Sequence, residues 1–323
     1  MAEMNDPVER LAAVLADYRE GELPRPNAEH IERWVGQFDS TARDAILHEL
    51  SHVFGQTYLS RATVADFLAS LAKSNKVAGP DPEDFWRGAN FLNIQERGQS
   101  QKELLDLFSG VLKAQYGFGI EECGSAGGTF VYLDDGVFTG NRLLSDLELW
   151  DPSRKHRGTR IHVIAAAIHR GAVHYVQSRL SDYSFRWSRV LQLENRKSEK
   201  NISDVLWPAA IPDDELVREY CEMLGGEGYP PTLRRPGKSG SEFFSSEPGR
   251  QALEEQFLKA GCKIRALNPN LNNYQRPLGN MVLRGLGFGT LVVTYRNCPN
   301  NAPLALWAGD PWYPLLPRKT NWQ

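Results

Sequence analysis

The spacing of apolar residues divides the chain into a helical beginning and a longer region in which strands and helices alternate. Before about residue 73, apolar residues recur at helical spacing in segments separated by short polar breaks. From about residue 85, short apolar runs alternate with polar loops and helical segments, which is typical of a mostly parallel sheet flanked by helices. We therefore predict an α/β fold in which a small all-helical N-terminal domain (1–80) precedes an α/β domain (81–323). The Gly- and Pro-containing stretch 73–82 is the candidate linker.

Several apolar runs in the second region have the length of strands. The clearest cover residues 91–95, 130–133, 161–168 and 290–295. The third of these is the most apolar, because Val163 to Ile168 contains no polar residue, as expected of a central parallel strand buried on both faces. We also predict a helix over 248–260, followed by a short strand over 264–267.

The run 130–133 leads directly into two adjacent carboxylates, Asp134 and Asp135. A short loop ending in Thr139 and Gly140 follows, and an apolar-periodic segment then predicts a helix. Open α/β sheets bind ligands beyond the carboxyl ends of their strands, and a helix N-terminus attracts anions. Two carboxylates would repel an anion there unless a hard cation such as Mg²⁺ lay between them. The stretch therefore predicts a phosphate site with Mg²⁺; the alternative is a strand that ends in a solvated Asp-Asp turn.

Two further loops follow predicted strands and carry side chains suited to phosphate. The first contains Arg97, Gly98 and Ser100, where the glycine lets the backbone approach a ligand and the other two supply hydrogen-bond donors. The second contains Arg296 and Asn297, which suit phosphate or base edges. We predict that both loops bind ligand.

The segment His48-Glu49-Leu50-Ser51-His52 matches the HExxH pattern of zinc proteases. A third ligand is missing, because Tyr58 stands where such a protein needs His or Asp. The helix is also not preceded by a sheet on which it would pack. We therefore interpret the motif as accidental, with its polar side chains facing solvent or making capping contacts.

Composition and charge narrow the class of protein. A hydrophobic content of 41% and a charged content of 24% are ordinary for a soluble globular chain. The formal net charge of −3 disfavours coating nucleic acid through bulk charge. The four cysteines are widely spaced, which predicts reduced thiols and a cytoplasmic protein. We find no signal peptide and no apolar run of membrane length, and we expect no membrane association.

Basic residues gather locally despite the negative net charge. They lie within residues 154–157, 186–200 and 234–238. The stretch 183–201 interleaves aromatic and basic residues, which either binds single-stranded nucleic acid by stacking or, as we favour, forms an amphipathic strand edge. Residues 225–240 are predicted to be a long exposed loop. The Trp-rich tail is expected to fold back onto the core, with a partner surface as the alternative.

The acidic stretch resembles the phosphoribosyl-pyrophosphate loop of type I phosphoribosyltransferases, in which an apolar strand leads to two acidic residues and a Thr-Gly turn. The resemblance implies that Asp134 and Asp135 face the ribose hydroxyls and the metal-bound diphosphate. It also implies that the loop after them binds the 5′-phosphate. The loop residues concerned are Gly136, Val137, Phe138, Thr139, Gly140, Asn141 and Arg142. Arg142 departs from the pattern, which has a second Thr or Ser there. The loop with Arg97 stands in the order expected of the family's pyrophosphate loop.

The spacing between the two loops also departs from the family pattern. About 30 residues separate them, which is too few for the long hood that covers the substrate in many members. We expect Gly124, Ser125, Gly127 and Gly128 to form a short mobile loop at most.

Most of the chain resembles the phosphoribosyltransferase-like proteins of bacterial conflict systems, some of which are associated with retrons. The features that carry this resemblance are Trp34, Gln37-Phe38, Asn93-Ile94-Gln95, Gly98, Ser100-Gln101, Asp134-Asp135, Thr139-Gly140, Tyr295 to Asn301 and Leu306-Trp307. The resemblance implies an effector of anti-phage defence, with a reverse transcriptase and its RNA–DNA product as partners.

Two functions from different classes follow from these observations. We favour a phosphoribosyltransferase-like enzyme that acts on phosphoribosyl pyrophosphate or a nucleotide with Mg²⁺ and stabilises a leaving diphosphate electrostatically. The alternative is a catalytically inactive nucleotide-sensing or assembly subunit of the same kind of complex. In either case we expect weak direct binding of nucleic acid and a protein contact through residues 1–80 and the Trp-rich tail.

Overall fold

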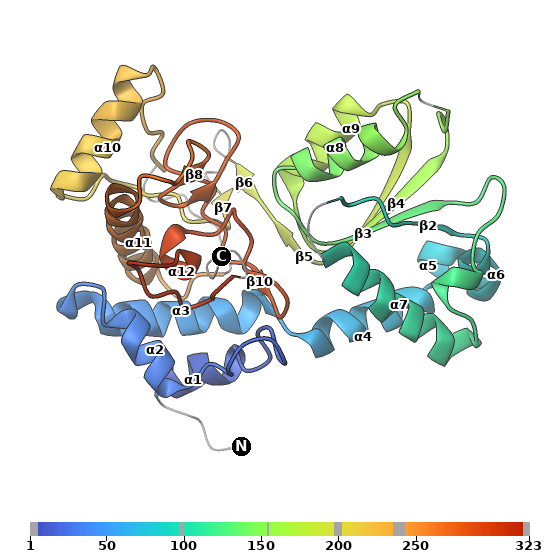
Figure 1. The fold of residues 1–323 in the computed structure, drawn as a ribbon, viewed down its shortest axis with the longest axis horizontal. Helices are drawn as coiled ribbons and strands as arrows, with labels where there is room; N and C mark the ends of the chain where they lie inside the picture. Colours follow the sequence, from blue (N-terminus) through green and yellow to red (C-terminus); the bar gives the residue numbers. More distant parts are fainter. Residues whose placement is uncertain (1–5, 97–99, 154, 197–201, 235–242, 319–323) are drawn as a thin grey trace. The chain divides into compact units, whose positions relative to one another are not determined.

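A computed structural model describes residues 6–96, 100–153, 155–196, 202–234 and 243–318. The chain forms two compact units (Figure 1). The first unit joins residues 1–59 to residues 194–323, and the second contains residues 60–193. None of the described helices is both long enough and apolar enough to cross a membrane.

The first unit is mainly helical and combines the two ends of the chain. Its elements are α1 (Pro7–Val14), α2 (Ala28–Val35), the 3-10 helix η1 (Ser40–Ala42), α3 (Arg43–Thr57), β1 (Tyr58–Leu59), β6 (Asn195–Arg196), β7 (Ile202–Ser203), α10 (Glu215–Gly226), α11 (Glu247–Leu267), β8 (Gln275–Arg276), β9 (Gly279–Asn280), β10 (Val293–Thr294) and α12 (Leu304–Trp307).

Aromatic residues from both ends of the chain meet in the core of the first unit. Trp34 and Trp312 are both buried, and the indole N–H of each donates to the carbonyl oxygen of Ala305, at 2.8 and 2.9 Å. Phe38 packs edge-on against Trp312 with ring centroids 5.4 Å apart. The tail therefore folds back onto the core, as predicted, and the N-terminal helices share that core with it. The sequence boundary near residue 80 and the linker 73–82 instead fall inside the second unit.

Two strand predictions in the first unit are wrong. Residues 264–267 continue helix α11 to Leu267, since a short apolar run after a helix does not distinguish a strand from another helical turn. Of residues 290–295, only Val293 and Thr294 form a strand, β10. The partner of β10 is β1, a parallel strand of two residues, which limits the pairing.

The predicted exposed loop 225–240 is confirmed for residues 227–230, which are exposed and lie outside helices and strands, but it is wrong at Arg234. Arg234 is one of the most deeply buried residues of the chain, and its guanidinium donates to Glu247 and Glu254. Residues 235–242 lie outside the described part of the chain.

The second unit is built on a four-stranded parallel sheet. Its elements are α4 (Arg61–Ala72), α5 (Asn75–Ala78), α6 (Pro82–Arg87), β2 (Asn90–Leu92), α7 (Ser100–Tyr116), the 3-10 helix η2 (Ile120–Glu122), β3 (Phe130–Val137), α8 (Asn141–Trp150), β4 (Arg160–His169), α9 (Arg170–Arg179) and β5 (Ser184–Leu193). The strands lie in the order β2-β3-β4-β5, and all three pairings are parallel. The predicted α/β class with a parallel sheet flanked by helices is confirmed.

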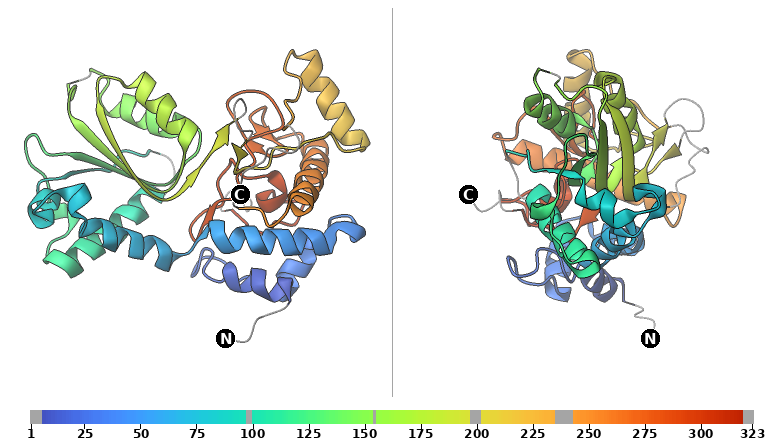
Figure 2. Two further views of the ribbon diagram at one scale, coloured as in Figure 1. Left: turned by 180° about the vertical axis from the view of Figure 1, so that it is seen from behind. Right: turned by 90° about the vertical axis from the view of Figure 1, so that its right-hand side faces the viewer.

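Helices cover both faces of this sheet. Figures 1 and 2 show α8 and α9 on one face and α4 and α7 on the other. Central strand β4 is buried from Ile161 to Ile168, which confirms the prediction for its apolar run. The aromatic and basic stretch 183–201 supplies β5, which forms one edge of the sheet, as the strand interpretation expected.

Candidate ligand site at the end of strand β3

The acidic pair lies in the carboxyl half of β3. Val131, Tyr132 and Leu133 are completely buried, as their apolar pattern predicted. The strand then continues past the carboxylates to Val137, because Gly136 and Val137 still pair with β4. The prediction that the strand stops at the acidic pair is therefore wrong by a few residues.

Asp134 is a buried carboxyl in the carboxyl half of the strand. It is 6% exposed, and its Oδ1 accepts hydrogen bonds from the backbone N–H of Asp135, at 2.9 Å, and from the Ser100 hydroxyl, at 3.3 Å. Burial and the neighbouring charge of Asp135 raise the pKa of Asp134 well above its usual range. Asp135 is partly exposed. One carboxyl is thus held inside the protein, while the next one reaches solvent.

The turn after β3 delivers the chain into α8. Gly140 has a φ of +81°, and a Cβ there would lie 2.9 Å from Val176 Cγ2 and 3.3 Å from the carbonyl oxygen of Ala172. Only glycine suits both the left-handed backbone and this close contact with α9. The Thr139 hydroxyl accepts from the N–H of Asn141, at 3.4 Å. The first N–H groups of α8 have no acceptor within the helix and are suited to an anion.

One buried glutamine, Gln101 in the first turn of α7, connects the start of the loop after β2 to strand β3. Its Oε1 accepts from the backbone N–H groups of Ile94 and Gln95, at 2.7 and 2.9 Å. Its Nε2 donates to the carbonyl oxygen of Leu133, at 3.3 Å. Gln101 therefore fixes the start of the loop after β2 against the strand that carries the acidic pair.

Sequence reasoning missed a second polar group, which lies between β3 and α8. The Tyr132 hydroxyl donates to Asp146 Oδ2, at 2.8 Å, and accepts from Gln95 Nε2, at 2.9 Å. A tyrosine in a fully buried strand needs a partner for its hydroxyl, and Asp146 stands on the same helical face as Leu143 and Leu147. A tyrosine within a buried strand and an aspartate on the apolar face of the following helix could together have predicted this buried polar pair.

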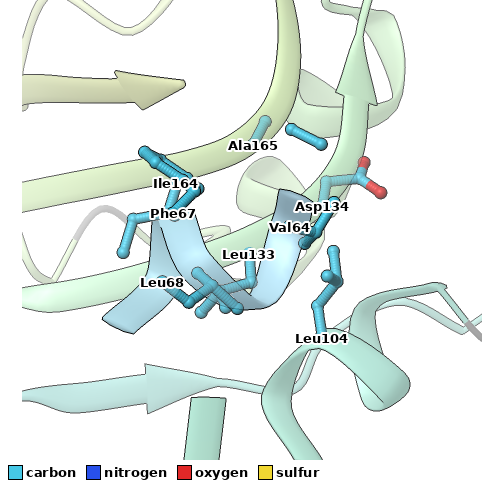
Figure 3. A pocket seen from close by; sticks show the side chains of 9 residues that line it. Val64, Phe67, Leu68, Leu104, Leu133, Asp134, Ile164 and Ala165 are labelled. Atoms are coloured by element: carbon cyan, nitrogen blue, oxygen red, sulfur yellow. The ribbon is translucent and has the colours of Figure 1, made fainter. Parts of the chain in front are cut away.

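A small cavity lies beside Asp134, on the face covered by α4 and α7 (Figure 3). Its lining includes Val64, Leu104, Leu133 and Ile164, and its volume is about 10 Å³. That volume suits a single water molecule and is far below the size of a nucleotide pocket. This cavity is therefore too small to be the predicted ligand site.

Comparison with protein families decides what kind of protein carries this site. The profile of the PRTase-CE family matches residues 31–318, which is most of the chain and includes both units. The chain belongs to the PRTase-CE family. This assignment confirms a phosphoribosyltransferase-like protein, as the acidic stretch had indicated. No curated protein compared with the chain matches it.

The PRTase-CE chain brings only some of the predicted ligand residues together. Ser100 and Asp134 are in contact, and the turn with Thr139 and Gly140 follows on the same strand. Arg97 and Gly98 lie outside the described residues.

Arg296 and Asn297 lie in the first unit. Arg296 Nη1 donates to Glu22 at 2.9 Å, and the backbone N–H of Asn297 donates to the Thr294 hydroxyl. Their role in ligand binding stays a prediction.

Residues 124–128 form a short, largely exposed loop between η2 and β3, as predicted, and this loop lies away from the acidic pair. The Ser125 hydroxyl donates to the carbonyl oxygen of Gly88, and Asn90 Nδ2 donates to the carbonyl oxygen of Ser125. Both contacts lie at the amino end of β2, because the segment between α7 and β3 must return to that edge before the next parallel strand begins. The acidic pair lies toward the opposite edge.

The donor atoms at the acidic pair fit Mg²⁺. This ion binds through one or two carboxylates together with substrate phosphates and keeps several waters, and Asp134 and Asp135 supply two hard oxygen donors. Within the described ranges, no group of three or more His, Cys, Asp or Glu side chains is arranged to hold a metal ion by itself. Any metal at this site would therefore depend on ligand phosphates.

The HExxH segment has a structural use in this PRTase-CE protein. Glu49 is buried and accepts hydrogen bonds from the backbone N–H of Ser245, at 2.8 Å, and from its hydroxyl. His52 Nε2 lies 2.9 Å from Gln56 Nε2. Glu49 therefore holds the segment before α11. Our expectation that the polar side chains of this motif face solvent is wrong for Glu49.

Proposed function

We propose that this PRTase-CE protein binds phosphoribosyl pyrophosphate, or a nucleotide of the same ribosyl-phosphate class, at the carboxyl end of β3. The proposal rests on one juxtaposition: two carboxyls at the end of a buried parallel strand, followed within a few residues by Gly140 and the N-terminus of α8. The carboxyls suit ribose hydroxyls and a cation, and the turn suits the 5′-phosphate.

The proposed reaction breaks the bond between the ribose C1 and its diphosphate. Diphosphate leaves with the bonding electron pair, positive charge develops on the ribose ring, and the acceptor forms the new bond to C1 and releases a proton. Mg²⁺, when bound, supplies charge that stabilises the diphosphate. Asp134 and Asp135 would hold the cation and orient the ribose hydroxyls. The hydroxyl of Thr139 and the backbone N–H groups from Phe138 to Arg142 would hold the 5′-phosphate.

Titration calorimetry with phosphoribosyl pyrophosphate and Mg²⁺ tests this site. The double variant Asp134→Asn with Asp135→Asn should bind at least about 100-fold more weakly, because both charged donors to the cation are removed. Asp106→Asn is the matched control, since Asp106 is an exposed carboxylate on α7. Equal affinity in the double variant and the control would refute the proposal.

We further propose that this protein is an effector of bacterial anti-phage defence and that its enzymatic activity is needed for this role. The support is the family resemblance over most of the chain. Bacteria that express the double variant together with the genes that normally accompany it should lose protection from phage, while the variant protein remains folded. Full protection by that variant would argue against an enzymatic role.

A non-catalytic nucleotide sensor or assembly subunit is the second candidate. It is favoured by Arg142, which is exposed and stands where the related loop carries a second hydroxyl. A sensor would bind phosphoribosyl pyrophosphate saturably and release no pyrophosphate with any nucleobase. Release of pyrophosphate that depends on Asp134 would exclude it.

The proposed protein partner is a reverse transcriptase with its RNA–DNA product, and direct binding of nucleic acid is expected to be weak. The structure changes how a partner contact is tested. Trp34, Trp307 and Trp312 are buried in the core of the first unit, so these side chains are not the contact. Deleting residues 1–80 would remove part of that core, and surface substitutions are the better test.

A further inference from the structure

We propose that strand β5 pairs with β5 of a second copy of this chain, in antiparallel orientation, so that two four-stranded sheets join into one. The proposal concerns one edge of the sheet in the second unit and does not depend on the proposed ligand site. It rests on the open backbone groups of β5 and on the side chains that this pairing brings together.

The two edges of the sheet differ in length. Strand β2 closes one edge with three residues, whereas β5 extends over ten residues at the other (Figure 1). Native proteins commonly keep edge strands short, or place prolines and charges on them, because an open edge pairs with other strands. β5 contains no proline, and its two charged residues are Arg186 and Arg189. Arg186 donates to the carbonyl oxygen of Val77, which leaves Arg189 as the exposed charge of β5.

The backbone groups of β5 alternate between β4 and the open edge. In a parallel ladder, one residue directs both its N–H and its C=O to the neighbouring strand, and the next residue directs both away. The N–H of Ser184 donates to the carbonyl oxygen of Thr159, just before β4, at 3.0 Å. No backbone hydrogen bond joins the outward groups to another segment of the described chain. By this alternation, the residues with outward groups are Phe185, Trp187, Arg189 and Leu191.

One register of the antiparallel pairing matches side chains that attract each other. With Ser188 opposite Ser188 of the second copy, Trp187 lies opposite Arg189, and Phe185 lies opposite Leu191. These pairs join outward residues to outward residues, so each pair exchanges two backbone hydrogen bonds, about eight in all. A ring beside a guanidinium and a ring beside an aliphatic side chain are favourable cross-strand pairs. A two-fold axis at Arg189 would instead place like charges opposite each other, and an axis at Trp187 would shorten the pairing.

The pairing would also cover apolar groups that a single chain leaves partly in water. The rings of Phe185 and Trp187 are stacked with centroids 5.6 Å apart, and they pack against the core beneath α8 and α9. Both side chains are still partly exposed, and Val190 is 36% exposed. A second strand would remove this area from water. Because each copy uses the same edge, the assembly closes at two chains.

Analytical ultracentrifugation of the full chain tests the pairing. Wild type should sediment at twice the 36.4 kDa of one chain when its concentration is about 100 µM, and it should dissociate on dilution. Arg189→Pro removes an outward N–H, at a position where an edge strand tolerates proline, and should weaken the dimer at least about 100-fold. Arg189→Ala keeps that N–H and should weaken the dimer less than about 10-fold. A monomeric wild type, or a dimer that Arg189→Pro leaves unchanged, would overturn the proposal.

Disulfide cross-linking provides a second measurement that leaves the backbone of β5 intact. Ser188 would lie opposite its own copy in a pair without backbone hydrogen bonds, where the Cα atoms are about 4.5 Å apart, a separation that a disulfide can span. Ser188→Cys should therefore form a covalent dimer on mild oxidation, beyond the level of wild type.

Gln192→Cys is the matched control for this cross-link. Gln192 is exposed and lies on the same face of β5 as Ser188, because the two residues are four apart in a strand. In the proposed register it is about 26 Å from its own copy, so it should not cross-link. Cross-linking of both variants, or of neither, would contradict the pairing.

Discussion

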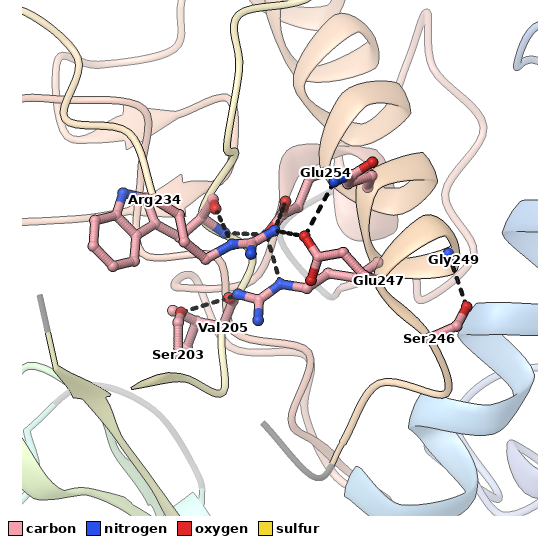
Figure 4. Close-up of polar contacts among 10 residues, drawn as sticks. Ser203, Val205, Arg234, Ser246, Glu247, Gly249 and Glu254 are labelled. Atoms are coloured by element: carbon pink, nitrogen blue, oxygen red, sulfur yellow. Dashed lines mark hydrogen bonds and ion pairs between the residues drawn. The ribbon is translucent and has the colours of Figure 1, made fainter. Parts of the chain in front are cut away.

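Two buried carboxyl groups, one in each unit, have contrasting surroundings. Glu254 on α11 accepts from Arg250 Nε at 2.8 Å, from Arg234 Nη2 at 2.9 Å and from the backbone N–H of Trp207 at 3.0 Å (Figure 4). Asp134 on β3 is nearly as buried, and it accepts hydrogen bonds from the backbone N–H of Asp135 and from the Ser100 hydroxyl; the uncharged Gln95 side chain also interacts with it. Glu254 is paired with cations of its own unit, whereas no cationic side chain among the described residues donates a hydrogen bond to Asp134.

This difference is the one expected between a structural carboxylate and the proposed ligand-binding one. A buried charge is tolerated when cations and hydrogen bonds surround it, and Glu254 meets that condition without any ligand. Asp134 keeps a raised pKa because burial and Asp135 oppose its ionisation. In the proposed function, a cation that arrives with the ligand would reduce that cost, so the ligand would stabilise the folded protein.

The largest expected effect comes from breaking the paired carboxylate. Glu254→Gln should lower the free energy of unfolding by about 3–5 kcal/mol, because the buried Arg250 loses its charge partner and the buried Arg234 keeps only Glu247. Chemical denaturation of the purified protein measures this. Glu255→Gln is the control: Glu255 is half exposed and pairs with Lys259, and its loss should cost under about 1 kcal/mol. Similar costs at the two positions would remove the distinction drawn for Glu254.

Removing the negative charge of Asp134 should stabilise the protein, in contrast to the loss of stability expected at Glu254. Asp134→Asn should raise the free energy of unfolding at pH 7 by about 1–3 kcal/mol, since a carboxyl with a raised folded-state pKa is costly to ionise. The cost grows as pH rises from the unfolded pKa of about 3.9 through the folded value, so the gain should vanish near pH 3. Denaturation at both pH values provides the measurement. A loss of stability at pH 7 would mean that Asp134 is structural.

A buried histidine in the same sheet provides a smaller test of the principle. His162 is fully buried in β4 with its Nε2 2.8 Å from the Ser188 hydroxyl, and burial lowers its pKa to about 3. The unfolded chain binds the proton below about pH 6.5, so stability should fall as pH drops from 6.5 towards 3.

The variant His162→Gln should lack this contribution. Between pH 6.5 and pH 5, wild type should lose about 2 kcal/mol more than the variant. Denaturation at the two pH values measures the difference. Parallel pH profiles for the two proteins would show that His162 makes no such contribution.

Local sequence patterns predicted much of the second unit and the position of the acidic pair. The apolar runs of β3 and β4 predicted buried parallel strands, and the position of Asp134 after such a run predicted a ligand site. The polar partners could not be read in the same way. Tyr132 and Asp146 are paired across two elements, and the direction in which Tyr132 points depends on tertiary packing.

The first unit was harder to predict because its contacts join distant parts of the chain. Arg234 lies in a stretch rich in Gly and Pro, which favours a loop, and only the position of Glu254 explains its burial. The same is true of Glu49, which looked like part of a metal motif and instead holds Ser245. Helix periodicity still predicted the helical character of the chain before residue 60 and most of α11.

The interrupted course of the first unit has a consequence for synthesis on the ribosome. Residues 60–193 form a contiguous unit that can fold as soon as it leaves the exit tunnel, since domains generally fold as units during translation. Helices α1 to α3 emerge earlier but lack their core partners, including Phe257 and Trp312. The apolar face around Trp34 therefore stays exposed while about two hundred further residues are translated. We expect chaperones that bind apolar surface to recognise the nascent chain during this time.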